Sequence, residues 1–173
     1  ASNKNMESLP ISPKDVDFVV LTHAHIDHSG LLPRLCAQGF RGPIYCTKAT
    51  YELLKILLPD SAHLQLADLE RAERKMKLGK WRGELPVSLY SREDVDLALT
   101  QFKVLEYGQV HELAPGMSLQ FQNAGHILGS AIAVLEIEED GTIYISCLGG
   151  DGYLEAKEII EAMTQPPKVG RIY

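Results

Sequence analysis

The sequence has few cysteines and no long apolar run, and both absences narrow the class of protein. Its three cysteines, Cys36, Cys46 and Cys147, are odd in number and far apart, which fits neither a zinc knuckle nor an even disulfide framework. No stretch reaches the roughly eighteen apolar residues of a membrane-spanning helix. Residues 1–5 also lack the basic and apolar regions of a signal peptide. We therefore expect a soluble, cytoplasmic protein with reduced thiols in its core.

Positive charge is scarce as well. The chain carries 17 Lys and Arg against 23 Asp and Glu, a formal net charge of −6. Proteins that attract nucleic acid by overall charge present a surplus of Lys and Arg to the phosphates. That mode of binding is disfavoured here, and a nucleic-acid ligand would need a local basic surface. At 173 residues with 45% apolar content, the chain can bury one sizeable core, so residues 1–173 are predicted to form a single domain.

Histidine, in contrast, is concentrated in one short stretch. Four potential ligands, His23, His25, Asp27 and His28, lie within six consecutive positions, one residue after the apolar run 18–21. That run predicts a short buried strand. In an extended segment, residues at i and i+2 point to the same side, so one metal ion could accept a nitrogen from both His23 and His25. An exposed His-rich loop is the alternative, but four potential ligands in six residues favour a metal site.

Asp27 and His28 are expected where the chain leaves this strand and enters a helix at Ser29 and Gly30. A turn there could aim both side chains at a second ion. Imidazole together with carboxylate suits zinc, iron or manganese, with zinc the default, whereas calcium and magnesium prefer oxygen ligands. The N-terminus of the predicted helix would offer free N–H groups to an anion such as a phosphodiester.

Four segments together resemble a known family. Residues 21–30, 57–65, 86–90 and 123–131 are similar, in order and spacing, to the motifs of the metallo-β-lactamase superfamily of binuclear metallo-hydrolases. Within it they resemble the β-CASP branch, which contains cleavage-and-polyadenylation endonucleases and prokaryotic relatives that cut RNA. The resemblance covers about residues 15–138.

The resemblance implies a fold and also which parts of that fold this chain lacks. The fold would be an α+β, αββα sandwich, incomplete at the N-terminus, because residues 1–14 are too few for the strands that normally precede the first motif. The tail after residue 152 resembles the family's last helix and strand, which implies that the inserted β-CASP domain is missing. The absent parts would come from a second copy of the chain or from a complementary segment.

The resemblance also implies a site. His126 would be the third ligand of the ion held by His23 and His25, and Asp151 would bridge two ions, whose repulsion a shared carboxylate offsets. Two zinc ions would lower the pKa of a shared water to about 7 and act as Lewis acids on a phosphate. Asp27 would orient the resulting hydroxide. Two other histidines are given no catalytic role: His63 is expected to make structural hydrogen bonds, and His111 to lie at a surface strand position.

Three functions are compatible with such a site. The first is a zinc-dependent ribonuclease that cleaves phosphodiester bonds in single-stranded RNA. The second is a metallo-hydrolase of small esters or lactams, because one fold supports many reactions. The third is a truncated metal-binding domain with no activity of its own.

One basic run could serve an RNA ligand. It contains Arg71, Arg74, Lys75, Lys77, Lys80 and Arg82. Trp81, within the run, could stack on a base. The alternative is a solvated helix face, since Glu70, Glu73 and Glu84 partly cancel the charge.

The remaining elements follow from periodicity and turn residues. The first half is predicted to hold a strand over 43–46 and helices over 31–36, 47–58, 61–80 and 91–101. Gly39 and Pro59 would end the first two of these helices, and Ser91 would begin the last. The second is expected to bury Leu53, Leu54, Leu57 and Leu58. The second half is predicted to be an antiparallel meander over 104–105, 109–113, 118–123, 131–138 and 142–147, followed by a helix over 153–163 and a strand over 169–173.

Overall fold

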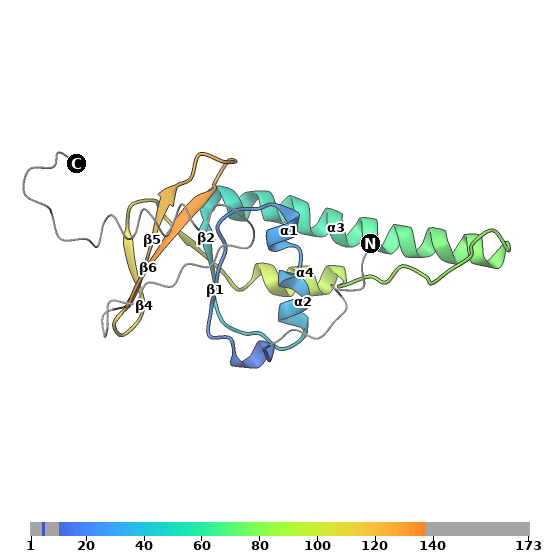
Figure 1. Ribbon diagram of the computed structural model, residues 1–173, viewed down its shortest axis with the longest axis horizontal. Helices are drawn as coiled ribbons and strands as arrows, with labels where there is room; N and C mark the ends of the chain where they lie inside the picture. The colour runs from blue at the N-terminus through green and yellow to red at the C-terminus, as the bar shows by residue number, and fades with distance from the viewer. Residues whose placement is uncertain (1–4, 6–10, 138–173) are drawn as a thin grey trace, which may run out of the picture. The chain divides into compact units, whose positions relative to one another are not determined.

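The computed structural model describes residue 5 and residues 11–137 (Figure 1). The chain divides into two compact units, the larger of which contains the described residues up to His111 together with Gln120–Ala133. The elements in chain order are η2 (Pro13–Asp15), β1 (Val19–Val20), α1 (Ile26–Ser29), α2 (Leu32–Ala37), β2 (Ile44–Thr47), α3 (Lys48–Lys77), α4 (Arg92–Leu99), β3 (Phe102–Leu105), β4 (Val110–Ala114), β5 (Met117–Asn123) and β6 (Ala131–Ile137).

The first sheet has the order β1-β2-β3, and all its described pairings are parallel. Ile44 pairs with Val19 on one side and Phe102 on the other, and it is fully buried. The segment around β3 was predicted to belong to the meander, which is wrong. The crossover through α3 and α4 is long enough to return the chain parallel to β2, whereas a short turn permits only an antiparallel neighbour.

Helix α3 is longer than the sequence predicted. Pro59 lies inside it and does not end it, so the two predicted helices 47–58 and 61–80 form one. An interior proline costs about 3 kcal/mol through its missing hydrogen bond and its ring. Leu54, Leu58 and Ala62 are buried on either side of Pro59 and offset this cost. Leu57, in contrast, is exposed and not in the core.

Helix α4 begins as the sequence predicted. The Ser91 hydroxyl accepts a hydrogen bond from the Asp94 N–H at 3.2 Å, and the Asp94 carboxylate accepts one from the Ser91 N–H at 2.8 Å. This reciprocal pair satisfies two N–H groups that a helix start leaves open. Helix α4 packs against α2 and α3 in the larger unit.

Two of the four family-like segments contact each other. The Gln65 side-chain oxygen accepts a hydrogen bond from the Leu89 N–H at 2.8 Å, and the Tyr90 hydroxyl donates to the Ser61 hydroxyl at 2.9 Å. Segments 57–65 and 86–90 are therefore joined at the middle of α3. His63 was expected to bond here, but its side chain is exposed and Ser61 makes the contacts instead.

The second sheet has the order β4-β5-β6. Pro115 and Gly116 form the turn between β4 and β5, and Gly116 has a φ of 73°. Leu119 and Phe121 of β5 are fully buried. His111 of β4 differs from expectation, because its Nε2 is buried and has no hydrogen-bond partner among the described residues.

Two further predictions concern the core and the membrane. Cys36 and Cys46 are buried free thiols, as expected. No helix in the described part of the chain combines the length and apolar character that crossing a membrane requires. The elements predicted over 142–147, 153–163 and 169–173, and Cys147 with them, lie outside the described residues.

Candidate metal centre

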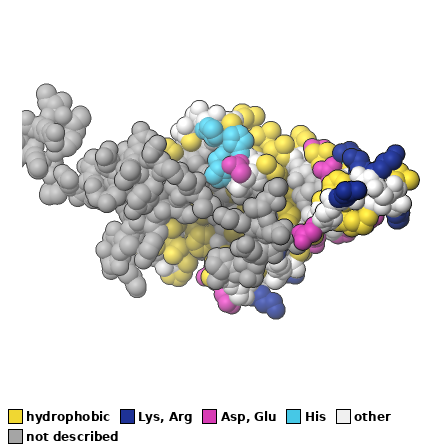
Figure 2. Space-filling model, turned by 45° about the vertical axis from the view of Figure 1, so that its right-hand side comes forward, with side chains coloured by type: hydrophobic (Ala, Val, Ile, Leu, Met, Phe, Trp, Pro, Cys, Tyr) yellow, Lys and Arg dark blue, Asp and Glu magenta, His cyan; other side chains and the backbone are white. Residues whose placement is uncertain are grey.

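Three histidine side chains converge within the larger unit. His23 Nε2 lies 3.2 Å from His25 Nδ1, and His126 Nε2 lies 3.3 Å from the same His25 nitrogen. One nitrogen from each ring lies within 4.8 Å of the other two. In Figure 2 the histidine side chains form one patch on the surface. His25 and His126 are 101 positions apart in the sequence, yet their side chains lie side by side.

The spacing of these nitrogens fits a metal ion. Zinc binds imidazole nitrogens at about 2.0–2.1 Å, so two nitrogens of one tetrahedral site lie about 3.3 Å apart. Hydrogen bonding explains the cluster less well, because a proton at His25 Nδ1 can be shared with only one of its two neighbours. A cation at the centre can accept a lone pair from all three.

His23 is held by the residue before it. The Thr22 hydroxyl lies 3.0 Å from His23 Nδ1, and the Thr22 carbonyl accepts a hydrogen bond from the Ala131 N–H at 2.8 Å. A hydrogen bond from Nδ1–H to the hydroxyl would leave Nε2 unprotonated and free to bind a metal. Thr22 thereby joins His23 to the start of β6.

The surroundings also favour the neutral form of His23. Burial lowers the pKa of the His23 imidazole, and the charges of His28, His25 and His126 lower it further, against a smaller opposite effect of Asp27. Neutral imidazole is the form that binds metal.

A short helix that the sequence did not predict, α1, begins directly after His25 and precedes the expected helix start at Ser29 and Gly30. The buried Ser29 hydroxyl donates to the carbonyls of Ala24 and His25 at 3.2 and 3.0 Å, which ties the last turn of α1 to the loop before it. Gly30, expected at a helix start, is the C-cap of α1, and its N–H bonds to Ile26. The predicted anion site at residues 29–30 is therefore wrong, because these N–H groups already have partners.

The loop that carries His126 is shaped by Ser130. Its hydroxyl accepts hydrogen bonds from the N–H groups of His126 and Ile127 at 3.0 and 3.1 Å. The Asn123 side chain accepts a third from the Gly125 N–H at 2.8 Å. Gly125 has a φ of 67°, which a glycine adopts without strain. The backbone on both sides of His126 is thus fixed.

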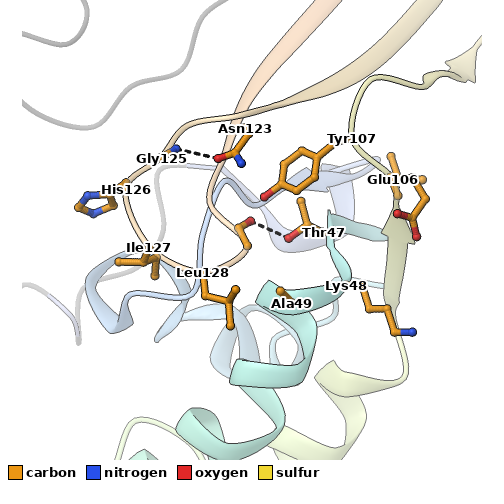
Figure 3. Close-up of a pocket in the computed structure, with 12 residues that line it drawn as sticks. Thr47, Lys48, Ala49, Glu106, Tyr107, Asn123, Gly125, His126, Ile127 and Leu128 are labelled. Carbon is orange, nitrogen blue, oxygen red and sulfur yellow. Dashed lines mark hydrogen bonds between the residues drawn. The ribbon is translucent and has the colours of Figure 1, made fainter.

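The same loop is bonded to the start of α3. The hydroxyls of Thr47 and Thr50 both donate to the Gly129 carbonyl, at 2.6 and 2.9 Å (Figure 3 marks the former). Gly129 has a φ of 82°, and a Cβ there would lie 2.5 Å from the Thr50 nitrogen. Only glycine allows this approach.

A cavity of about 560 Å³ lies beside this loop. His126 and Asn123 line it from the loop, and Lys48 lines it from the start of α3 (Figure 3). Tyr107 lines it as well, and its hydroxyl donates to the Ser130 carbonyl at 2.9 Å. The candidate centre thus has an open space next to one of its histidines.

Asp27 and His28 lie beside the three histidines on α1. The His28 ring centre is 4.3 Å from that of His23, and His28 Nε2 is 3.6 Å from Asp27 Oδ2. The Asp27 side chain is 76% exposed, so its carboxylate is open to solvent. Neither residue joins the group formed by the three converging nitrogens. Asp151, the sixth predicted ligand, lies outside the described residues.

Sequence reasoning missed the hydroxyl groups that position the histidines. Thr22, Ser29, Thr50 and Ser130 hold the backbone or rings of the cluster through hydrogen bonds. Two of them could have been suspected from the sequence, because Thr22 directly precedes His23 and Ser130 directly follows Gly129. Thr50 gave none, because its partner lies 79 positions away.

The fold and the three histidines define a metal-binding domain with mixed α/β structure. The chain belongs to the metallo-β-lactamase superfamily, since the family model described as the metallo-beta-lactamase superfamily domain matches residues 1–158. The expected resemblance is thereby confirmed at the level of the superfamily. The histidine trio is accordingly a site able to hold a metal ion.

Curated relatives agree with the narrower resemblance. The chain is 36% identical over 159 residues to a transcription termination factor FttA of Methanocaldococcus jannaschii, covering 91% of this chain and 22% of that protein. It is 37% identical over 159 residues to the FttA of Methanococcus maripaludis, with the same coverage. It is 35% identical over 164 residues to a ribonuclease of Thermus thermophilus, covering 95% of this chain and 32% of the relative. The chain thus spans about a fifth to a third of these relatives.

Proposed function

We propose that this chain is the metal-binding part of a zinc-dependent hydrolase that cleaves phosphodiester bonds in RNA. The convergence of His23, His25 and His126 supports a metal-dependent reaction. The RNA substrate is supported by a relative named as a ribonuclease and by others named as transcription termination factors. We further propose that residues 1–173 act as one domain, in the cytoplasm.

The proposed ligands fall into two sets. His23, His25 and His126 would hold one ion, Asp27 and His28 would hold a second beside it, and Asp151 would bridge the two. Zinc supplies a Lewis acid and lowers the pKa of water to about 7, which suits hydrolysis of a phosphodiester at neutral pH. The exposed Asp27 carboxylate would in addition accept a proton from the attacking water and orient it. The cavity beside His126 would receive the substrate segment next to the scissile bond.

The test compares two histidine variants. Purified protein loaded with zinc is assayed for metal content and for cleavage of 5′-labelled single-stranded RNA. His126→Ala should lose metal and reduce cleavage by about 100-fold or more, since even residues behind the ligands are worth 10–100-fold. His63→Ala is the matched control, because His63 is an exposed histidine in the middle of α3.

The outcomes separate the three candidate functions. Cleavage of RNA that His126→Ala abolishes and His63→Ala preserves supports the proposal. Turnover of an ester or lactam with no RNA cleavage would replace it with a small-molecule hydrolase. Zinc binding with no hydrolysis of either substrate would identify an inactive metal-binding domain.

A further inference from the structure

Positive charge on this acidic chain is concentrated at one end of α3. Residues 71–82, here called the α3 tip, contain six Lys and Arg and one Glu, although the whole chain has a formal charge of −6. In Figure 2 most of the visible dark blue side chains gather at the right-hand side of the view, away from the histidine patch. The α3 tip therefore has a net positive charge, whereas the other residues of the chain together have a net negative charge.

The cations of the α3 tip are exposed and mostly unpaired. Arg71 bonds to Asp68 at 3.0 Å. Among the described residues, the four cations Arg74, Lys77, Lys80 and Arg82 have no carboxylate partner within salt-bridge distance. Every residue from 73 to 80 is exposed. A solvated helix face normally interleaves both signs, whereas Glu73 is the single acidic residue among the six cations of the tip.

The tip is ordered by backbone hydrogen bonds that fix its end. The Lys80 N–H donates to the Lys75 carbonyl at 2.8 Å, and the Gly79 N–H donates to the Met76 carbonyl at 2.9 Å. Gly79 has a φ of 65°, so the two bonds close the helix in a left-handed turn. The chain then reverses direction and places Trp81 beside the last turn of α3.

Trp81 adds an aromatic surface to these cations. Lys75 Nζ lies 6.0 Å from the centre of the Trp81 ring, and the indole N–H donates to the Glu84 carbonyl at 3.4 Å. The ring is partly exposed and is not part of the buried core. An aromatic ring among exposed cations is the arrangement that binds single-stranded nucleic acid, with phosphates on the cations and a base on the ring.

We propose that the α3 tip is a second RNA-binding surface, distinct from the metal centre, that holds the backbone of the substrate and stacks one base on Trp81. The identity of the ligand rests on the proposed function. Helix α3 starts beside the His126 loop and runs for 30 residues, about 45 Å at 1.5 Å per residue. The tip therefore binds a part of the RNA distant from the bond that is cleaved.

RNA fits this surface better than an acidic protein does. An acidic protein segment could pair with the cations, but its carboxylates would not stack on the partly exposed indole of Trp81. Base stacking contributes about 1–3 kcal/mol and tolerates any base, which suits a ribonuclease substrate of varied sequence. Binding should thus depend on salt and little on sequence.

Trp81 makes the proposal directly measurable, because it is the single tryptophan of the chain. Single-stranded RNA titrated into the zinc-loaded protein should quench Trp81 emission as a base stacks. Polyglutamate of equal charge should leave the emission unchanged. Trp81→Ala, followed by fluorescence anisotropy of labelled RNA, should weaken binding about fivefold or more.

The charge contribution is tested with two double variants. Arg74→Gln with Lys77→Gln removes two exposed cations of the tip and keeps good helix formers. Binding should weaken about tenfold at low salt, and the slope of log K against log salt should become shallower by about 1.4, at about 0.7 per phosphate contact. Arg92→Gln with Lys103→Gln changes net charge equally and should alter neither quantity.

These measurements do not depend on cleavage. Tip variants that bind RNA as tightly as the control pair, or RNA that fails to quench Trp81, would overturn the proposal even if the protein cleaves RNA. Equal quenching by polyglutamate would assign the surface to an acidic protein and overturn it too. RNA binding at the tip without any hydrolysis would support the surface and contradict the proposed function.

Discussion

The Thr50 hydroxyl donates a hydrogen bond of 2.9 Å to the carbonyl of Gly129, which lies 79 positions later in the chain. This contact ties the loop between β5 and β6 to the first turn of α3. His126 lies three residues before Gly129, so the position of one candidate ligand depends on a helix with which it shares no sequence motif. Thr47 reinforces the contact from the position before the helix.

Removing the Thr50 hydroxyl should therefore weaken the metal centre. Thr50→Val keeps the size of the side chain, and the Gly129 carbonyl retains Thr47 as a donor, so we expect a loss of about 1 kcal/mol in unfolding free energy. Zinc affinity, measured by competition with a chelator, should fall about 10-fold, within the range for residues that orient ligands. An affinity equal to wild type would show that this contact does not position His126.

Gly129 and Gly125 provide a matched pair of substitutions. Both have positive φ, but a Cβ on Gly129 would lie 2.5 Å from the Thr50 nitrogen, whereas a Cβ on Gly125 would meet nothing within 4 Å. Gly125→Ala should cost about 1 kcal/mol from its backbone conformation alone, and Gly129→Ala clearly more. Urea unfolding measures both. Equal losses would mean that the backbone relaxes away from α3.

Thr22 should control the protonation of His23. Thr22→Val removes the hydroxyl that lies 3.0 Å from His23 Nδ1 and should lower zinc affinity by about 10-fold or more. Thr22→Ser restores a hydroxyl and should recover most of that affinity. If serine and valine behave alike, the effect comes from packing and not from the hydrogen bond.

The two buried thiols should be unreactive in the folded protein. Burial raises the pKa of Cys36 to about 11 and that of Cys46 to about 12, from an ordinary 9.0. In a Cys147→Ser background, a thiol reagent at pH 8 should label neither residue until denaturant is added. Rapid labelling without denaturant would contradict the burial of both side chains.

The same raised pKa values set the direction of a pH effect. In the unfolded chain these thiols lose their protons near pH 9, whereas the folded protein retains them to about pH 11 and 12. Their contribution to stability is therefore complete below pH 9 and disappears as the pH rises through 11 and 12. Unfolding free energy measured by urea from pH 8 to 10.5 should fall, and a flat profile would contradict it.

Local sequence signals predicted some of this fold and not the rest. The helix start at Ser91 was predicted correctly because neighbouring residues decide it. The helix end expected at Pro59 is wrong, since burial on both sides of Pro59 outweighs its local cost. The place of β3 in the parallel sheet was missed as well, because strand pairing is a long-range property.

The candidate site followed the same division. The spacing of His23 and His25 alone predicted that they share a metal ion. The place of His126 beside them was expected only from the family resemblance, because no local pattern indicates it. The short helix α1 before the predicted helix was missed, and its buried Ser29 hydroxyl bonds to carbonyls that precede it. Among the hydroxyl groups behind the histidines, that of Thr50 gave no signal in the sequence, because its partner Gly129 lies 79 positions away.

The central claim is that His23, His25 and His126 bind one metal ion together. A crystal structure of the zinc-loaded protein, with anomalous data collected at the zinc edge, tests it most directly. We expect one zinc peak about 2.0–2.1 Å from His23 Nε2, His25 Nδ1 and His126 Nε2. A zinc ion bound elsewhere, with the His126 ring turned away from His23 and His25, would contradict the account.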